Sequence, residues 1–276
     1  MKFSVSLSVY KNDTPKIFKK AFASIVQQTL EPSEVVLVVD GPITILLEKV
    51  VFELEQNCNC LKVIRLLENS GHGVARQIGI ENCSFDIVAL MDSDDISVPD
   101  RFEKQIEKFI NDPTLSIVGG YIDEFVNGSG ELIGKRVVPS QNNQIRNLIK
   151  SKCPMNQVTV MFRKTEVIKA GGYLDWYCNE DYYLWIRMYI KGAKFENIPE
   201  VLVNVRVDKD TYKRRGGWKY FISEAKLQSY MLARKIISLP RFIFNVLIRF
   251  LLQVIFTDSM RSLFFKKFAR KGLQSV

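Results

Sequence analysis

The chain has 276 residues, of which 47% are hydrophobic and 25% are charged. This apolar content is enough for a sizeable core and excludes an intrinsically disordered chain, while 15 Gly and 9 Pro exclude a collagen-like or low-complexity one. The formal net charge of +9 is unevenly distributed, because residues 206–276 hold 16 Lys and Arg against 4 Asp and Glu, and residues 1–205 hold 23 against 26. The basic character therefore belongs to the C-terminal tail.

The cysteine and histidine content limits the sites that the chain can hold. The five cysteines are Cys58, Cys60, Cys83, Cys153 and Cys178, and the one histidine is His72. An odd number of cysteines in no paired framework favours a reduced, cytoplasmic setting, and without a CxxC pair a zinc site is not expected. The N-terminal apolar run is too short for a signal peptide, and no run reaches about 18 apolar residues, so no membrane-spanning helix is expected.

Residues 1–98 alternate short β-branched runs with helical patterns. We expect strands at residues 3–10, 34–39, 61–66 and 86–91, and helices at residues 15–28, 43–56 and 73–81. Helical crossovers between short strands predict an α/β fold with a mostly parallel, doubly wound, Rossmann-like sheet. Ligands bind such a sheet beyond the carboxyl ends of its strands, so the residues that follow each strand are the first candidates for function.

Residues 99–205 have a mixed pattern. We expect a helix at residues 100–111, strands at 116–125 and 131–138 around a turn at Asn127–Gly130, a helix at 141–150, a strand at 159–163 and a helix at 180–191. This half is predicted to be α+β material packed on the edge of the sheet.

Carboxylates directly follow the predicted strand at residues 86–91, in the run Asp92-Ser93-Asp94-Asp95. Asp92 and Asp94 are two residues apart and would share a face if the strand continued. Like charges held this close need a cation between them, and carboxylate oxygens suit Mg²⁺ or Mn²⁺. The alternative is a solvated turn that caps the helix beginning near Pro99.

Three other segments reach the same rim, and each is ambiguous by itself. The run Asn69–Arg76 places two glycines before a helix, and it either binds an anion through backbone amides and the Arg76 guanidinium or is only a turn. Asp40-Gly41 is otherwise a turn, and Glu180-Asp181 begins a helix, where carboxylates are favoured anyway. Together with the carboxylates at 92–95, these segments are the parts of a metal-assisted reaction of a diphosphate.

Six segments occur in the order and at the spacing of a known enzyme family. They are Ser4–Tyr10, Ser24–Thr29, Val38–Gly41, Asn69–Arg76, Asp92–Asp95 and Glu180–Trp185. Over about residues 3–205 the chain resembles the bacterial family 2 glycosyltransferases, and most of all the small enzymes that extend lipid-linked oligosaccharides for O-antigen, capsule or exopolysaccharide. The resemblance implies a GT-A fold, with a nucleotide-binding half (residues 1–98), an acceptor half (99–205) and a separate tail (206–276).

The resemblance also implies the reaction and its setting. The enzyme would move a hexose or N-acetylhexosamine from a nucleotide sugar, usually a uridine diphosphate (UDP) sugar, to a polyprenyl diphosphate-linked saccharide, with inversion at the anomeric carbon. Mn²⁺ or Mg²⁺ would neutralise the departing diphosphate. The enzyme would be cytoplasmic and peripheral on the inner face of the cell membrane, with no nucleic acid as a partner.

Carried over position by position, the resemblance implies the site residues. The donor nucleotide would be bound by Val9, Tyr10, Asp40, Arg76 and Ser93. Asp92 and Asp94 would form the DxD element, with Asp94 as the more direct metal ligand, and Asp95 would orient the donor sugar. Asp181 would be the general base that removes the proton of the acceptor hydroxyl.

Two positions depart from the family pattern. Relatives often have His at the position of Gln157, where the amide keeps a donor but cannot carry a positive charge. Many relatives also have two Asp residues where the second strand here ends in Asp40 alone. The interior helical position of Trp185 predicts core packing rather than an acceptor platform.

The tail has its own pattern, with a helix at residues 218–238, an apolar segment at 241–256 interrupted by Arg241 and Arg249, and a basic run at Phe264–Lys271. A cationic helix rich in Phe and Leu is typical of an interfacial anchor to an anionic membrane surface. The lipid-linked acceptor favours this interpretation. The alternative is a helix packed on the catalytic domain with its basic residues in solvent.

Two other functions are weighed against this one. A nucleotidyltransferase acting on sugar phosphates uses carboxylates and a metal on a similar sheet, but it would carry a glycine-rich, lysine-containing loop where Tyr10–Pro15 lies. The isoelectric point of 9.2 suggests a nucleic-acid-binding protein. Against this, the basic residues alternate with aliphatic runs rather than with aromatic stacking platforms.

Overall fold

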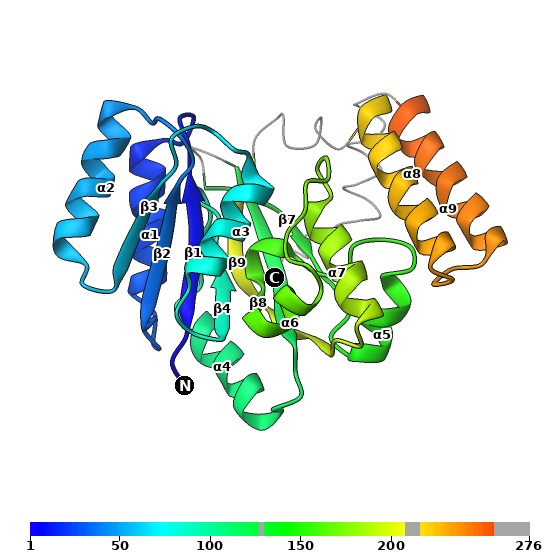
Figure 1. Ribbon diagram of the computed structural model, residues 1–276, viewed down its shortest axis with the longest axis horizontal. Helices are drawn as coiled ribbons and strands as arrows, with labels where there is room; N and C mark the ends of the chain where they lie inside the picture. The colour runs from blue at the N-terminus through cyan, green and yellow to red at the C-terminus, as the bar shows by residue number, and fades with distance from the viewer. Residues whose placement is uncertain (127–129, 208–215, 257–276) are drawn as a thin grey trace.

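The computed structural model describes residues 1–126, 130–207 and 216–256 (Figure 1). The elements of the first half are β1 (Ser4–Val9), α1 (Pro15–Val26), β2 (Glu34–Val39), α2 (Ile45–Asn57), β3 (Leu61–Arg65), α3 (His72–Asn82) and β4 (Ile87–Leu90). They are followed by β5 (Ile96–Ser97), α4 (Arg101–Asn111), β6 (Ile117–Val126), β7 (Leu132–Arg136), α5 (Asn142–Leu148), the 3₁₀ turn η1 (Gln157–Thr159), β8 (Met161–Arg163), α6 (Lys164–Lys169), α7 (Glu180–Ile190) and β9 (Phe195–Val207). The last elements are α8 (Trp218–Ala233), α9 (Leu239–Phe250) and the π-helical turn η3 (Leu251–Ile255).

The described strands form one sheet in the order β3-β2-β1-β4-β8-β6-β9-β5, with β7 paired to β6. The strands β3, β2, β1 and β4 are parallel, as the sequence predicts for the first half. The sheet as a whole is mixed, because β8 lies antiparallel between β4 and β6. The α/β fold class is therefore confirmed, with the parallel part confined to residues 1–98 and to the pair β6 and β9.

Alternating side chains divide the interior into two cores, one on each face of the sheet. Val5, Leu7 and Val9 of β1 are buried on the face that α1, α2 and α4 cover. On the other face, Ser6 lies so near Gly79 of α3 that a Cβ at position 79 would collide with the Ser6 hydroxyl. These two small residues allow α3 to approach the sheet closely, and hydrogen bonds from the backbone of Ser70 and Gly71 to Asp40 hold the loop before α3 at the end of β2.

The second core joins residues 99–205 to the helices of the tail. It contains buried side chains from α3, α5, α6, α7 and α8, with Trp185 fully buried as its position predicts. The hairpin of α8 and α9 lies at the end of the molecule opposite to α2 (Figure 1). The two helices predicted in the tail are thus present, and they pack beside α5 and α7 rather than on residues 1–98.

Several elements differ from those predicted. β9 is not among the predicted strands and continues past residue 205, where the tail is expected to begin. Most of the predicted turn at Asn127–Gly130 and the whole basic run at Phe264–Lys271 lie outside the described residues. Within the described ranges, no helix has the length and apolar character needed to cross a membrane. All five cysteines lie in these ranges, and none of them forms a disulfide.

Candidate active site

A cavity of about 620 Å³ opens at the carboxyl ends of β1, β2 and β4. Its lining includes six of the predicted site residues, namely Val9, Tyr10, Asp40, Asp92, Ser93 and Asp94. The other three, Arg76, Asp95 and Asp181, lie outside the lining. The structure therefore brings most of the predicted donor residues together at the rim that the sheet topology predicts.

Asp40 shapes one wall of the cavity through the loop that precedes α3. Its buried carboxylate accepts hydrogen bonds from the backbone nitrogens of Ser70 (2.7 Å) and Gly71 (3.1 Å) and from Asn69 Nδ2 (2.9 Å). Gly41 has φ of 80°, and a Cβ there would collide with the backbone nitrogen of Asn69. Both carboxylate oxygens of Asp40 thus bind the loop at residues 69–71. The described contacts of Asp40 therefore position the wall of the cavity.

Three carboxylates crowd the centre of the cavity. Burial, followed by the charges of Asp92 and Asp13, raises the pKa of Asp94 to about 6. Burial also raises the pKa of Asp13, whose Oδ2 accepts a 2.8 Å hydrogen bond from the Tyr10 backbone nitrogen. Asp13 belongs to the segment Tyr10–Asp13, which follows the first predicted strand and is therefore among the candidates for function. The sequence predicted no specific role for it.

This donor set fits a divalent cation that is completed by substrate oxygens. No group of three or more His, Cys, Asp and Glu side chains within the described ranges is arranged to hold a metal ion by itself. Mg²⁺ is typically held by one or two carboxylates together with phosphate oxygens and waters, and Mn²⁺ suits the same hard oxygen ligands. Asp92 and Asp94 offer such a pair, and a cation between them would offset the repulsion that adds to the effect of burial on Asp94.

Arg76 lies behind the cavity and joins the two halves of the site. Its Nη2 is 2.7 Å from Asp92 Oδ1 and its Nη1 is 3.3 Å from Glu180 Oε1. Burial opposes ionisation of Asp92, but the Arg76 guanidinium overrides it and lowers the pKa of Asp92. Arg76 is only 8% exposed. Its described contacts are therefore with two carboxylates, and it holds the start of α7 next to the end of β4.

His72 lines the cavity beside this bridge. Its Nε2 is 3.8 Å from Asp92 Oδ1 and its Nδ1 is 4.0 Å from Glu180 Oε1. The positive charge of Arg76, followed by burial, lowers the pKa of His72 to about 4. The imidazole is therefore neutral at physiological pH, and His72 is a further side chain that lines the site.

Asp95 ties the carboxylate run to the end of β9. It is 3% exposed, and its Oδ1 accepts a 2.8 Å hydrogen bond from the Arg206 backbone nitrogen. Arg206 Nε donates to the carbonyl oxygen of Asp94 (3.0 Å), and Arg206 and Val207 line the cavity. The last residues of β9 thus form a wall that sequence reasoning missed, because that strand was not predicted.

Arg101 supports the end of β4, just before the carboxylate run. The sequence did not predict a role for Arg101 in the site. It is fully buried, and its Nη2 donates to the Leu90 carbonyl oxygen (2.8 Å) while its Nε donates to Gln105 Oε1 (3.0 Å). Burial lowers the pKa of Arg101 to about 9, and the charges of Asp92 and Asp95 oppose that effect. Arg101 fixes the end of β4, from which the carboxylate run begins.

Asp181 is the second residue of α7 and follows Glu180. Its Oδ1 accepts a hydrogen bond from the Tyr182 backbone nitrogen (2.6 Å), and the Cys153 thiol donates to its Oδ2 (3.8 Å). Burial, then the charge of Asp181, raises the pKa of Glu180. The two neighbouring carboxylates therefore have different partners, because Glu180 contacts Arg76 and Asp181 contacts Cys153.

Gln157 does not line the cavity. Its Nε2 donates to the hydroxyl of buried Tyr173 (2.7 Å), whose ring packs edge-on to Trp185 at 6.4 Å. Gln157, where the chain departs from the family pattern, therefore lies outside the cavity and contacts Tyr173.

Comparison with known proteins agrees with this geometry. The profile of glycosyl transferase family 2 matches residues 4–171. A UDP-Gal:alpha-D-GlcNAc-diphosphoundecaprenol beta-1,3-galactosyltransferase of Escherichia coli is 36% identical over 99% of this chain and 98% of its own length. The amylovoran biosynthesis glycosyltransferase AmsE of Erwinia amylovora is 37% identical over 98% of this chain and 100% of its own.

The fold is also similar to that of solved glycosyltransferase structures. The crystal structure of S. aureus TarS 1-349 in complex with UDP-GlcNAc superposes with a TM-score of 0.66 over 96% of this chain and 75% of that one, at 18% identity. The family match and the two relatives identify the chain as a glycosyltransferase, which replaces the nucleotidyltransferase alternative. The chain belongs to glycosyl transferase family 2 and has the GT-A-like α/β fold of its structural neighbours.

Proposed function

We propose that this chain is an inverting, metal-dependent enzyme that transfers one hexose or N-acetylhexosamine from a UDP-sugar to a polyprenyl diphosphate-linked saccharide in the synthesis of an O-antigen or capsule. The observation that carries the proposal is the lining of a single cavity by Asp92 and Asp94 together with the loop before α3. The E. coli relative named above, which acts on a diphosphoundecaprenol acceptor, supports the substrate classes.

The donor nucleotide would occupy the cavity between β1 and the loop before α3. Tyr10 is 41% exposed and lines the cavity, so its ring is available to pack against a flat base. Asp40 holds the loop through three hydrogen bonds, which presents a preformed wall to the ribose. A volume of about 620 Å³ falls within the usual range for pockets that bury a ligand of this size.

Asp94 and Asp92 would hold Mn²⁺ or Mg²⁺, which neutralises charge on the departing diphosphate when it is bound. Arg76 fixes the Asp92 carboxylate through its 2.7 Å contact and keeps it ionised. The two residues would therefore present an oriented oxygen ligand before the donor arrives, which reduces the reorganisation needed on binding.

Asp181 would act as the general base. It would take the proton of the acceptor hydroxyl while the hydroxyl oxygen forms its bond to the anomeric carbon and the bond to the diphosphate breaks on the opposite face. A single displacement of this kind inverts the anomeric configuration. The Glu180–Arg76–Asp92 bridge supports this role, because it fixes the start of α7 beside the donor cavity.

The enzyme would work as a peripheral protein on the inner, cytoplasmic face of the cell membrane. The acceptor class of the E. coli relative and the excess of basic residues after residue 205 support this location.

Calorimetric titration with UDP tests the donor site, first with Mn²⁺ and then with excess chelator. We expect binding that requires the metal and that guanosine diphosphate does not match. Equal binding of both nucleotides, or UDP binding that chelator leaves unchanged, would contradict the proposed donor and cofactor. The variant Asp175→Asn serves as a control, because Asp175 is an exposed carboxylate that does not line the cavity.

A further inference from the structure

Helix α9 and the turn η3 present apolar side chains to the outside of the molecule. Seven large hydrophobic residues there are between 39% and 62% exposed: Leu239, Ile243, Phe244, Leu247, Ile248, Leu251 and Ile255. Their spacing of three or four residues, with adjacent pairs, places them along one side of the helix. We call this set the α9 apolar face.

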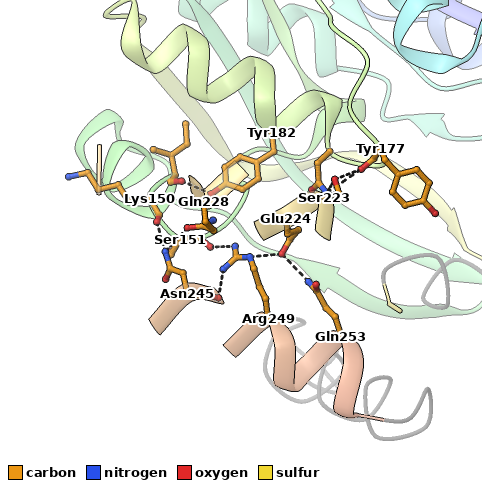
Figure 2. Close-up of polar contacts among 12 residues, drawn as sticks. Lys150, Ser151, Tyr177, Tyr182, Ser223, Glu224, Gln228, Asn245, Arg249 and Gln253 are labelled. Atoms are coloured by element: carbon orange, nitrogen blue, oxygen red, sulfur yellow. Dashed lines mark hydrogen bonds and ion pairs between the residues drawn. The ribbon is translucent and has the colours of Figure 1, made fainter. Parts of the chain in front are cut away.

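The opposite side of the same helix is polar and buried. Asn245, Arg249 and Gln253 are four residues apart and only 4%, 7% and 8% exposed. Figure 2 shows these three side chains pointing toward α8 and the end of α5. We call them the polar spine.

Two members of the polar spine contact the catalytic domain. Asn245 Nδ2 donates to the carbonyl oxygen of Lys150 (2.9 Å), and Arg249 Nη2 donates to that of Ser151 (2.5 Å). Both carbonyls lie just after α5, where the last turn of a helix leaves acceptors unpaired. The polar spine therefore satisfies backbone groups of the domain that carries Asp181.

The polar spine is also fixed to α8. The Nε of Arg249 lies 2.6 Å from Glu224 Oε2, and Gln253 Nε2 donates to the same oxygen (2.9 Å). Asn245 Nδ2 donates to Gln228 Oε1 (2.8 Å), and these contacts are drawn in Figure 2. Rotation of α9 about its axis would break this buried ion pair and its hydrogen bonds, so the apolar face is held outward.

This arrangement reverses the usual polarity of a surface helix, which buries its apolar side and exposes its polar one. Exposed apolar residues that gather on one side mark a surface that contacts a partner or a membrane. The two candidates for α9 are a lipid surface and a second copy of this chain.

Charge favours a lipid surface that is anionic. Residues 234–256 contain no Asp or Glu, and Arg234, Lys235 and Arg241 are exposed at the connection between α8 and α9. The sequence after residue 256 adds five Lys and Arg against one Asp. A second copy would bring the same positive charge to the contact, which is unfavourable, whereas anionic headgroups complement it.

We propose that the α9 apolar face lies in the interface of an anionic bilayer, with the polar spine holding the catalytic domain against that surface. Within the described residues no helix is long enough to span a membrane, so α9 would lie in the plane of the interface. The inference deepens the proposed function and partly rests on it, because a lipid-linked acceptor brings its reacting end to the same surface.

Flotation of the full-length chain with vesicles tests the proposal. Vesicles of phosphatidylglycerol and phosphatidylethanolamine are compared with vesicles of phosphatidylcholine. We expect the unaltered chain to float with the anionic vesicles. The double variant Phe244→Gln/Leu247→Gln should bind these vesicles at least about 10-fold more weakly. Both side chains are exposed, so the variant should keep its fold, which circular dichroism verifies.

The control is Ile45→Gln/Leu46→Gln on α2, at the other end of the molecule, where the side chains are 77% and 67% exposed. It removes comparable exposed apolar surface and should float like the unaltered chain. Flotation that the α9 variant leaves unchanged, or that both double variants reduce equally, would overturn the proposal. Failure of the unaltered chain to float, together with a dimer in sedimentation velocity that the α9 variant dissociates, would assign the face to a second copy instead.

The same samples separate this inference from the proposed function. UDP binding with Mn²⁺ should be the same in the unaltered chain and in both double variants, because none of these positions lines the cavity. Loss of flotation with UDP binding intact would confirm the surface and leave the donor site standing. If flotation depends on Phe244 and Leu247 but the unaltered chain does not bind UDP, the proposed function is overturned and the membrane surface stands.

Discussion

The hydroxyl of Tyr182 and the guanidinium of Arg249 donate to carbonyl oxygens only two residues apart, those of Ile149 and Ser151, each at 2.5 Å. Tyr182 follows Asp181 at the start of α7, and Arg249 belongs to α9. The end of α5 is therefore a common anchor for the helix that carries the proposed base and for the helix that carries the α9 apolar face. Figure 2 shows both side chains around this anchor.

The Arg249–Glu224 ion pair gives the first prediction. Arg249→Gln should lower the free energy of unfolding by about 3 kcal/mol, because it leaves the carboxylate of Glu224 buried without its partner. Urea unfolding followed by tryptophan fluorescence measures the change. Arg241→Gln, which alters an exposed arginine of the same helix, should stay within about 0.5 kcal/mol of the unaltered chain. Equal stability of the two variants would contradict a structural role for the pair.

Asp181 gives a kinetic prediction. Asp181→Asn should lower the transfer rate by about 100-fold or more, since an amide cannot accept the hydroxyl proton, while UDP affinity changes little. Initial rates with a UDP-sugar and a polyprenyl diphosphate-linked saccharide that the unaltered chain accepts, together with UDP titration, separate the two effects. Asp175→Asn should keep both. Unchanged turnover in Asp181→Asn would remove Asp181 from the role of base.

The metal pair gives a prediction about cofactor removal. In the unaltered chain, chelator should weaken UDP binding by at least about 10-fold, whereas Asp94→Asn should bind UDP weakly with or without Mn²⁺. Calorimetry at fixed UDP and varied Mn²⁺ measures this dependence. A full response to Mn²⁺ in Asp94→Asn would show that Asp94 is not a ligand.

Gly41 allows conformational strain to be separated from a steric clash. Gly41→Ala should destabilise the fold and weaken UDP binding, because the new Cβ would displace the loop at Asn69 that Asp40 holds. Gly192→Ala is a matched control, since Gly192 has φ of 85° but nothing within 4 Å of an added Cβ. The control should cost about 1–2 kcal/mol from its left-handed backbone and leave UDP binding intact. Equal UDP affinity in the two variants would contradict the role of the loop.

Glu34 gives a prediction about pH. Burial alone would raise its pKa, but donors from Ser4 and Ser84 stabilise the carboxylate and lower the pKa below the ordinary value of 4.5. A lowered pKa in the folded state means that the stabilisation is present at neutral pH and is lost as the pH falls through that value.

Glu34→Gln should therefore be less stable than the unaltered chain by about 1 kcal/mol at pH 7, with the difference shrinking below about pH 4. Urea unfolding at pH 7, 5 and 3.5 measures it. Glu31→Gln, at an exposed position, is the control. A difference that grows as the pH falls would have the wrong sign for this account.

Much of the structure of residues 1–98 could be predicted from the sequence. The alternation of β-branched runs with helical patterns located β1 to β4 and the helices between them, and the rule for parallel sheets placed Asp40, Asp92 and Asp94 at one rim. These predictions succeed because strand and helix periodicity is local, and because parallel strands bring their carboxyl ends to one edge.

The structure of residues 99–207 was less predictable. β9 was missed because Pro199 and polar residues interrupt its first half, although Val201, Val203, Val205 and Val207 alternate as a strand requires. Its absence from the prediction also hid Arg206 and Val207 as part of the cavity wall. The order of strands around β8 depends on pairing between segments distant in the chain, which no local pattern encodes.

The sequence by itself determined the family motifs, the parallel half of the sheet and the presence of two apolar, basic helices in the tail. Only the tertiary structure decided which side of α9 faces outward. The sequence shows Arg249 interrupting an apolar segment, but its partners are Glu224 on α8 and the Ser151 carbonyl beyond α5. Burial of a polar side chain is favourable only where a donor or acceptor is already in place, and the fold alone supplies those partners.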